Sequence, residues 1–127
     1  MKFHHSDDAP AALGPYSQAV EVEGLLFLSG QTGLDPATGN LAPGGFEPEA
    51  HQVLANLRAV LTAAGLTFAD VVRTGIYLTD FANFPKINEI YAAAMGDHRP
   101  ARTTIEVKGL PKGAQVEIDM VARRPRF

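Results

Sequence analysis

The chain has 127 residues, of which 46% are hydrophobic, and its 11 Lys and Arg against 14 Asp and Glu give a formal net charge of −3. This length suits one domain, residues 1–127, and it allows a core that needs no disulfide or metal for stability. The absence of Cys excludes disulfides, zinc ribbons, iron–sulfur clusters and a thiol nucleophile. The mildly acidic balance argues against a dedicated nucleic-acid binder, which usually carries a basic excess.

The N-terminal residues and the hydrophobic runs predict where the protein resides. The first ten residues are polar and lack the apolar stretch of a signal peptide. The longest apolar runs span about six residues, far below the roughly 20 that cross a bilayer as a helix. We therefore expect a soluble, cytoplasmic protein in a reducing compartment.

The first 30 residues predict an irregular arm followed by a β-hairpin. Residues 1–15 contain two prolines and mixed charges, which indicates an irregular arm. Residues 17–22 and 25–29 have the composition of two short strands. Glu23 and Gly24 between them form a tight hairpin signal.

A glycine- and proline-rich stretch, residues 31–45, precedes the first predicted helix, residues 47–64. Pro48 suits the first helical position. Gly65, with Leu66 after it, is typical of a Schellman stop. The apolar residues of this segment recur on one helical face. They are Val53, Leu54, Leu57, Val60, Leu61 and Ala64.

The second half of the chain alternates strands with a helix. Residues 71–79 read as a strand, and the helix that follows ends at about Met95, with Gly96 as its stop. Residues 102–108 and 114–123 predict a closing hairpin. The order ββαβαββ predicts an α+β fold: a mixed sheet with two helices packed on one face.

The predicted closing hairpin has a register that follows from its apolar residues. Placing Val107 opposite Ala114 keeps both apolar sets on one face, because a slip by one residue would bury the charges. This register gathers four polar residues on the face away from the helices: Arg102, Thr104, Glu117 and Asp119. The cluster is either a solvated sheet surface with a cross-strand Arg102–Asp119 pair or a functional site.

The face away from the helices is also expected to carry apolar groups. Residues 20–28 place apolar side chains on both faces of their strands. A sheet that is apolar on both faces, with one layer of helices, needs a second cover. In a chain this short we expect that cover to be another copy of the chain, with a site at the junction.

Several kinds of chemistry find no support in the sequence. The four histidines have no metal-ligand spacing, so no metal is expected, and His51 is placed on the exposed side of the first helix. The glycine-rich segments match neither nucleotide-binding motif. Ser29 lacks the G-x-S-x-G context of a hydrolase nucleophile. Seven of the eleven Lys and Arg lie at or beyond Arg99, but no aromatic platform for stacked bases accompanies them.

Five segments carry a resemblance to a known family. They are GPYSQAV at 14–20, LSGQ at 28–31, PARTTIEV at 100–107, LPKG at 110–113 and VEI at 116–118. The sequence resembles the RidA/YjgF family, the reactive intermediate/imine deaminases. The resemblance covers about residues 9–124, and its most diagnostic stretch begins at Pro100.

The resemblance implies a chorismate-mutase-like fold and a homotrimer whose sheets form a central barrel, with sites at the subunit interfaces. It implies hydrolytic deamination of 2-imino and enamine acids, such as 2-iminobutanoate and 2-iminopropanoate, to 2-oxoacids and ammonia. This reaction removes reactive products of pyridoxal-phosphate enzymes. It needs no cofactor.

The resemblance also implies roles for individual residues. Arg102 matches the residue that binds the substrate carboxylate, and Glu117 matches the acid that holds the attacking water. The other substrate-binding positions are Tyr16, Ser29, Gly30, Asn88 and Thr104. Many relatives carry Cys at the position of Thr104. This chain has Thr there, so a thiol has no part in its chemistry.

Two alternatives to the deaminase remain open at the level of sequence. One is an RNA-cleaving translation inhibitor, against which the net charge speaks. The other is a non-catalytic 2-oxoacid-binding or chaperone-like module. The connection at residues 96–100 is shorter than is typical of the family, which leaves the preferred size of the substrate open.

Overall fold

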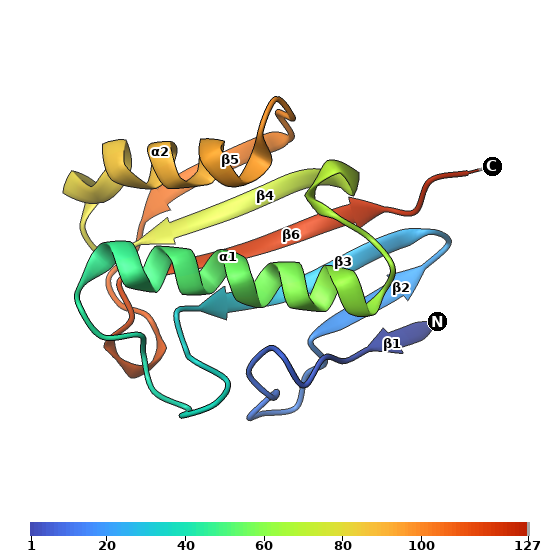
Figure 1. Ribbon diagram of the computed structural model, residues 1–127, viewed down its shortest axis with the longest axis horizontal. Coiled ribbons are helices and arrows are strands. Elements are labelled where there is room, and N and C mark those ends of the chain that lie inside the picture. The colour runs from blue at the N-terminus through green and yellow to red at the C-terminus, as the bar shows by residue number, and fades with distance from the viewer. Residues whose placement is uncertain (127) are drawn as a thin grey trace.

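The computed structural model, which describes residues 1–126, contains a six-stranded mixed sheet with two helices on one face (Figure 1). The strands are β1 (Lys2–His4), β2 (Ala19–Val22), β3 (Leu25–Thr32), β4 (Val71–Leu78), β5 (Ala101–Glu106) and β6 (Val116–Arg123). The helices are α1 (Phe46–Ala63) and α2 (Phe84–Met95), and three 3₁₀ turns are η1 (Phe68–Asp70), η2 (Phe81–Asn83) and η3 (Pro111–Gly113). The predicted α+β class and the single layer of helices are confirmed.

The strand order is β1-β2-β3-β6-β4-β5, with β4 and β5 parallel and every other pair antiparallel. The predicted closing hairpin is therefore wrong, because β4 lies between β5 and β6. The crossover through α2 returns β5 parallel to β4, and β6 then enters the centre of the sheet. The N-terminal arm also differs from the prediction, since Lys2–His4 pairs with β2 as an edge strand.

The turns and helix ends follow local chemistry. Glu23 and Gly24 both have positive φ, 50° and 78°, as a tight hairpin turn requires. At the end of α1, Gly65 has φ of 77°, and the Leu66 N–H donates to the Leu61 carbonyl at 2.9 Å. This is the expected Schellman motif. α1 begins one residue earlier than predicted, so Pro48 is its third residue.

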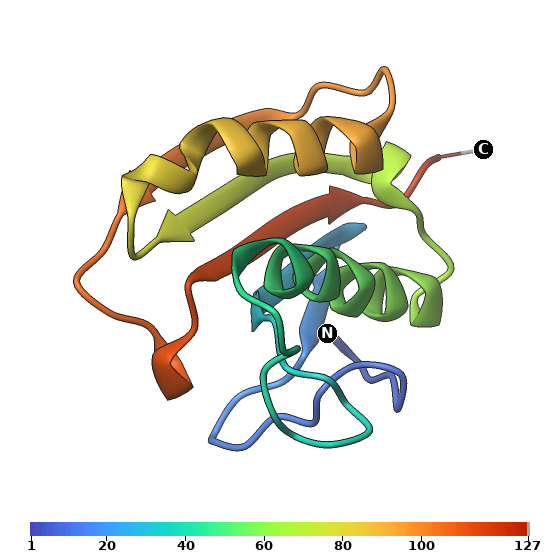
Figure 2. The same ribbon diagram turned by 60° about the vertical axis from the view of Figure 1, so that its left-hand side comes forward.

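The core lies between the helices and the sheet. Completely buried residues come from α1, α2 and the strands β2, β3, β4 and β6, and they include Leu57, Ile76, Ile87 and Ile118. α1 packs over β3 and β6, and Figure 2 shows both helices on the same side of the sheet. His51, on α1, is exposed as predicted.

The opposite face of the sheet, the open face, carries exposed apolar side chains. Phe3 on β1 is 68% exposed and Phe27 on β3 is 46% exposed, and these two strands lie in the same half of the strand order. Val22, Leu25 and Ile105 are also exposed. No element within residues 1–126 covers this face (Figures 1 and 2). No helix among these residues is long and apolar enough to cross a membrane.

Candidate functional site

Arg102 lies on β5 and points to the helix side of the sheet. Its Nη2 donates to Asn88 Oδ1 on α2 at 2.7 Å. Its guanidinium carbon lies 5.1 Å from the centroid of the Tyr91 ring and 5.8 Å from that of Phe84, within range of cation–π attraction. The group is thus held in place while most of its donors make no bond within the described chain.

The platform beneath Arg102 is itself fixed by the core. Tyr91 is 6% exposed, and its hydroxyl bonds the buried Thr74 hydroxyl on β4 at 2.9 Å. A satisfied, buried phenol gives the ring one orientation. The guanidinium therefore stacks on a rigid surface rather than on a mobile side chain.

Arg102 lines a cavity of about 290 Å³ that we call the Arg102 cavity. Its lining residues are Asn88, Tyr91, Ala92, Arg99, Pro100 and Arg102. No carboxylate of residues 1–126 lies within ion-pairing distance of either arginine. The cavity therefore carries unneutralised positive charge and suits an anionic ligand.

Glu117 lies on β6 and points to the open face, next to Tyr77 of β4 in the paired register. It lines a second cavity, of about 210 Å³, together with Tyr16, Gly30 and Lys112. We call this the Glu117 cavity. A Cβ on Gly30 would lie 2.9 Å from Glu117 Cδ, so the carboxyl occupies the space that the missing side chain leaves.

A bulge interrupts β3 beside Glu117. Leu28 pairs with Met120 and Gln31 pairs with Ile118, so two residues, Ser29 and Gly30, oppose one. Such bulges disrupt the ladder locally and are frequent next to functional sites. Gly30 thus lies at an irregularity of the strand that borders the Glu117 cavity.

Glu117 has a perturbed acidity. Burial raises the pKa of its carboxyl above the ordinary value, and the negative charge of Asp119 adds to the effect. Asp119 accepts a hydrogen bond from the Tyr77 hydroxyl at 2.9 Å, which with burial raises the pKa of Tyr77. A Cβ on Gly75 would lie 2.6 Å from Asp119 Oδ1, so this position too needs glycine. A carboxyl with a raised pKa is a stronger base once ionised.

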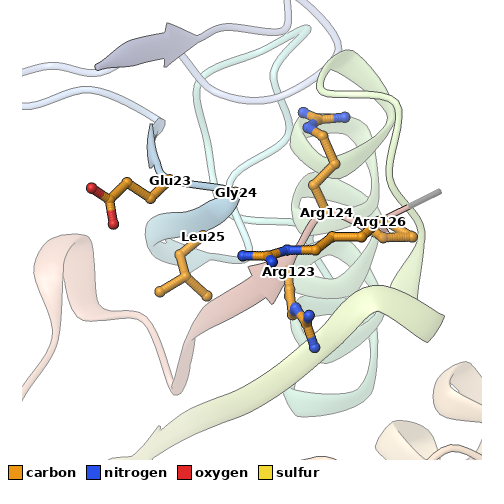
Figure 3. Close-up of a pocket in the computed structure, with 7 residues that line it drawn as sticks. Glu23, Gly24, Leu25, Arg123, Arg124 and Arg126 are labelled. Atoms are coloured by element: carbon orange, nitrogen blue, oxygen red, sulfur yellow. The ribbon is translucent and has the colours of Figure 1, made fainter.

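A further cavity, of about 720 Å³, lies at the opposite end of β6 from Glu117. Figure 3 shows Arg123 and Arg124 leaving the strand in opposite directions. The Arg124 guanidinium donates two hydrogen bonds to Glu21, which with His4 lowers the pKa of that carboxyl to about 2. Arg124 is therefore neutralised, and this cavity contains none of the site residues predicted from the sequence.

A comparison with known families identifies the family to which the chain belongs. A model of the family described as endoribonuclease L-PSP matches residues 6–124. The chain belongs to this family, which is the RidA/YjgF family.

Relatives across the family are similar over nearly their whole length. DfrA of Myxococcus xanthus is 50% identical over 123 residues, covering 95% of this chain and 94% of DfrA. A mouse protein named 2-iminobutanoate/2-iminopropanoate deaminase is 49% identical over 119 residues, covering 94% of this chain and 88% of its own. The crystal structure of RidA from an Antarctic Psychrobacter has a TM-score of 0.93 at 41% identity, covering 97% of this chain and 99% of its own.

The residues that match the family pattern fall into two groups in this chain. Arg102 and Asn88 meet in the Arg102 cavity, and Tyr16, Gly30 and Glu117 meet in the Glu117 cavity. The predicted cluster of Arg102, Thr104, Glu117 and Asp119 on one face is wrong. In the register of the sheet, Arg102 and Thr104 align with Thr74 and Ile76 on the helix side, whereas Glu117 and Asp119 point the other way.

Ser29 and Thr104 line neither cavity. The Ser29 hydroxyl donates to the Ser17 carbonyl at 2.6 Å and ties the β3 bulge to the preceding segment. The Thr104 hydroxyl is buried and has no hydrogen-bond partner within residues 1–126. No cluster of three or more His, Asp or Glu suited to a metal occurs among these residues.

The sequence did not point to four residues that support the two cavities. Tyr91 lies on a helix, where a buried aromatic is typical of the core, and its role beneath Arg102 follows from the parallel β4–β5 pairing. Arg99 was counted with the basic tail. Tyr77 and Gly75 gave no signal beyond their strand alternation, because their importance depends on contact with Asp119.

Proposed function

We propose that the protein hydrolyses 2-imino acids and their enamine tautomers to 2-oxoacids and ammonia, with 2-iminobutanoate and 2-iminopropanoate as substrates. The observation that carries the proposal is Arg102, half-buried, stacked on Tyr91 and bonded to Asn88, with no acid to neutralise it. Curated relatives named for this activity, at 49% identity in the mouse, support it. Such an enzyme would protect the cell from reactive products of pyridoxal-phosphate enzymes.

Arg102 binds the substrate carboxylate in this proposal. A planar guanidinium makes two parallel charge-assisted hydrogen bonds to a carboxylate. The bond to Asn88 uses Nη2 and leaves Nε and Nη1 without a partner within the described residues. The Gly30 N–H of a neighbouring copy, at the bulge in β3, would supply a further donor to the same carboxylate.

Glu117 activates water in this proposal. The enamine first tautomerises to the imine, and protonation of its nitrogen makes C2 electrophilic. The ionised Glu117 takes a proton from water as the oxygen bonds to C2, which gives a carbinolamine. Protonated Glu117 returns its proton to the amino group of the carbinolamine. The C–N bond then breaks and ammonia leaves, while the hydroxyl gives its proton to solvent and C=O forms, so one water is consumed for each imine. A positioned general base contributes about 10²–10⁴ in rate.

The two halves of this site lie on opposite sides of one sheet, so the proposal needs at least two copies of the chain. The Arg102 cavity, at the β5 edge of one copy, would face the Glu117 cavity on the open face of its neighbour. A homotrimer with a central barrel provides three such junctions, and the exposed Phe27 and Ile105 would be covered there.

A coupled assay tests the proposed reaction. Threonine dehydratase generates 2-iminobutanoate, and release of 2-oxobutanoate is followed with and without the protein. We expect faster release with the wild type, and Glu117→Gln should lower kcat by about 10²–10⁴. Arg102→Lys keeps the charge but loses the two parallel hydrogen-bond donors of the guanidinium, and it should lower kcat/KM by at least about tenfold. Wild-type protein without any effect on release would refute the deaminase.

Mixing two inactive variants tests whether the halves come from different copies. Arg102→Ala and Glu117→Ala chains are unfolded together and refolded as mixed oligomers. Random mixing places an intact Arg102 opposite an intact Glu117 in about a quarter of the junctions, so about a quarter of wild-type activity should return. If each site were contained within one chain, the mixture would stay inactive.

A further inference from the structure

Two arginines, not one, line the Arg102 cavity. Arg102 comes from β5, and Arg99 comes from the connection between α2 and β5, three residues earlier. The cavity of about 290 Å³ also contains the amide of Asn88, and no acid of residues 1–126 pairs with either guanidinium. One carboxylate on Arg102 would therefore leave the charge of Arg99 unused.

Two hydrogen bonds hold the guanidinium of Arg99 by one nitrogen and leave its opposite edge open to a ligand. Its Nη1 donates to the Gly96 carbonyl at 2.5 Å and to the His98 carbonyl at 2.9 Å. Both bonds use the same nitrogen. Nε and Nη2 have no partner within the described residues, and these two atoms form the fork that binds a carboxylate side-on.

The connection that carries Arg99 is held against the sheet. His98 Nε2 lies 2.6 Å from the Val71 carbonyl at the start of β4. Pro100 follows Arg99 and fixes the backbone at the entrance to β5. The guanidinium is thus exposed but tethered at its own connection, so a ligand would bind it with less loss of side-chain entropy than a free surface arginine.

We propose that the Arg102 cavity takes imino acids with a second acidic group, and that Arg99 is the specificity residue that binds it. The 2-carboxylate binds Arg102, and the distal carboxylate of a dicarboxylic imino acid binds the free edge of Arg99. This inference rests on the proposed deaminase for its reaction, but the binding of a dicarboxylate can be measured without turnover.

Binding of stable product analogues is the first test. 2-Oxoglutarate and 2-oxopentanoate have the same number of carbons and differ in the second carboxylate, and their affinities are measured by calorimetry. We expect 2-oxoglutarate to bind more tightly, and Arg99→Met to weaken its binding about tenfold while leaving 2-oxopentanoate unchanged. Because Arg99 is exposed, added salt should reduce the preference.

The matched controls separate charge from position. Arg126→Met removes an equally exposed guanidinium outside the Arg102 cavity and should change neither affinity. Arg99→Lys keeps the charge and should retain part of the preference for 2-oxoglutarate. Equal affinities for the two oxoacids in the wild type, or equal losses for both in Arg99→Met, would overturn the proposal.

Turnover distinguishes this inference from the proposed function. An amino-acid oxidase generates 2-iminoglutarate from glutamate and 2-iminopentanoate from norvaline. Loss of activity toward the first substrate alone in Arg99→Met supports both proposals. A wild type that turns over both imines, with no selective effect of Arg99→Met, overturns the role of Arg99 and leaves the deaminase standing. Arg99-dependent binding of 2-oxoglutarate without turnover of either imine supports the dicarboxylate site and refutes the deaminase.

Discussion

At the scale of single residues, Gly30 gives the Glu117 carboxyl the space it occupies. Its φ lies outside the left-handed region, so alanine is compatible with the backbone there, but a Cβ would lie 2.9 Å from Glu117 Cδ. Gly30→Ala should therefore displace the carboxyl and lower kcat by at least about tenfold, with a loss of about 1 kcal/mol or less in stability. Assays of imine hydrolysis and urea unfolding measure the two effects.

Gly109→Ala is the matched control for Gly30→Ala. Gly109 also lies outside the left-handed region, and a Cβ there would have no heavy atom within 4 Å. This variant should keep wild-type activity and stability. Equal activity in both variants would mean that the close packing of Gly30 against Glu117 has no part in the reaction.

The raised pKa of Glu117 also has a consequence for stability. The native state favours the protonated carboxyl, so ionisation at neutral pH costs folding free energy that the unfolded chain does not lose. Glu117→Gln should therefore raise the Tm at pH 7 while it lowers activity. The difference should shrink as the pH falls through the raised pKa of the folded state, and it should vanish below about 4.5, where the carboxyl is protonated in both states. Glu23→Gln, at the exposed hairpin turn, should show no such gain.

Single residues could be predicted where a motif contains them. Arg102 and Glu117 lie in diagnostic segments, and the structure places both in cavities. Tyr91 could not be recognised as the platform for Arg102. An aromatic residue on the apolar face of a helix indicates the core, and the pattern is the same whichever strand the helix covers. Its contact with Arg102 depends on which strand lies beneath α2, and the sequence pattern contains no such information.

At the scale of elements, the sequence predicted five of the six strands, all but β1, but it did not predict the neighbours of β5. Alternation shows which residues share a face of a strand, and it correctly separated Arg102 and Thr104 from Thr103 and Ile105. It does not show which face meets the helices. The polar residues of β5 were predicted on the face away from the helices, whereas Arg102 packs its guanidinium on the aromatic rings of α2. Edge strands permit this, because the helices cover them only in part.

The start of β6 is attached to α1 by one buried carboxylate. Glu49, 5% exposed, accepts hydrogen bonds from the backbone N–H and the side-chain amide of Gln115, both at 2.9 Å. Gln115 precedes Glu117 by two residues. Glu49→Ala should reduce the free energy of unfolding by about 2–4 kcal/mol, because bonds to charged groups are lost and two donors are left unpaired. Urea unfolding measures the loss.

Glu47→Ala provides the comparison for this prediction. Glu47 lies in the same first turn of α1, but its carboxylate is 59% exposed and lies 3.6 Å from Lys86. Surface pairs of this kind contribute less than about 1 kcal/mol. A loss in Glu49→Ala no larger than that in Glu47→Ala would show that the link between α1 and β6 does not stabilise the fold.

At the scale of the whole molecule, one chain presents two separate cavities, the two halves of the proposed site, and one uncovered sheet face. Arg102 opens toward the helix side and Glu117 toward the open face. Large apolar side chains are exposed on the open face, and Phe27 is 46% exposed. The same face carries the polar residues Glu117, Asp119 and Tyr77. A contact between copies would remove the apolar area from water and bring the halves together, so assembly and catalysis should fail together.

Phe27→Asp tests that coupling. An aspartate placed in an apolar contact between copies must be desolvated, which costs several kcal/mol. We expect the variant to sediment as a smaller species than the wild type and to lose imine hydrolysis, with an unchanged far-ultraviolet circular dichroism spectrum. Ala55→Asp places the same charge on the exposed face of α1 and should alter neither the mass nor the activity. If Phe27→Asp keeps the wild-type mass, the open face is not where copies meet, whatever reaction the protein catalyses.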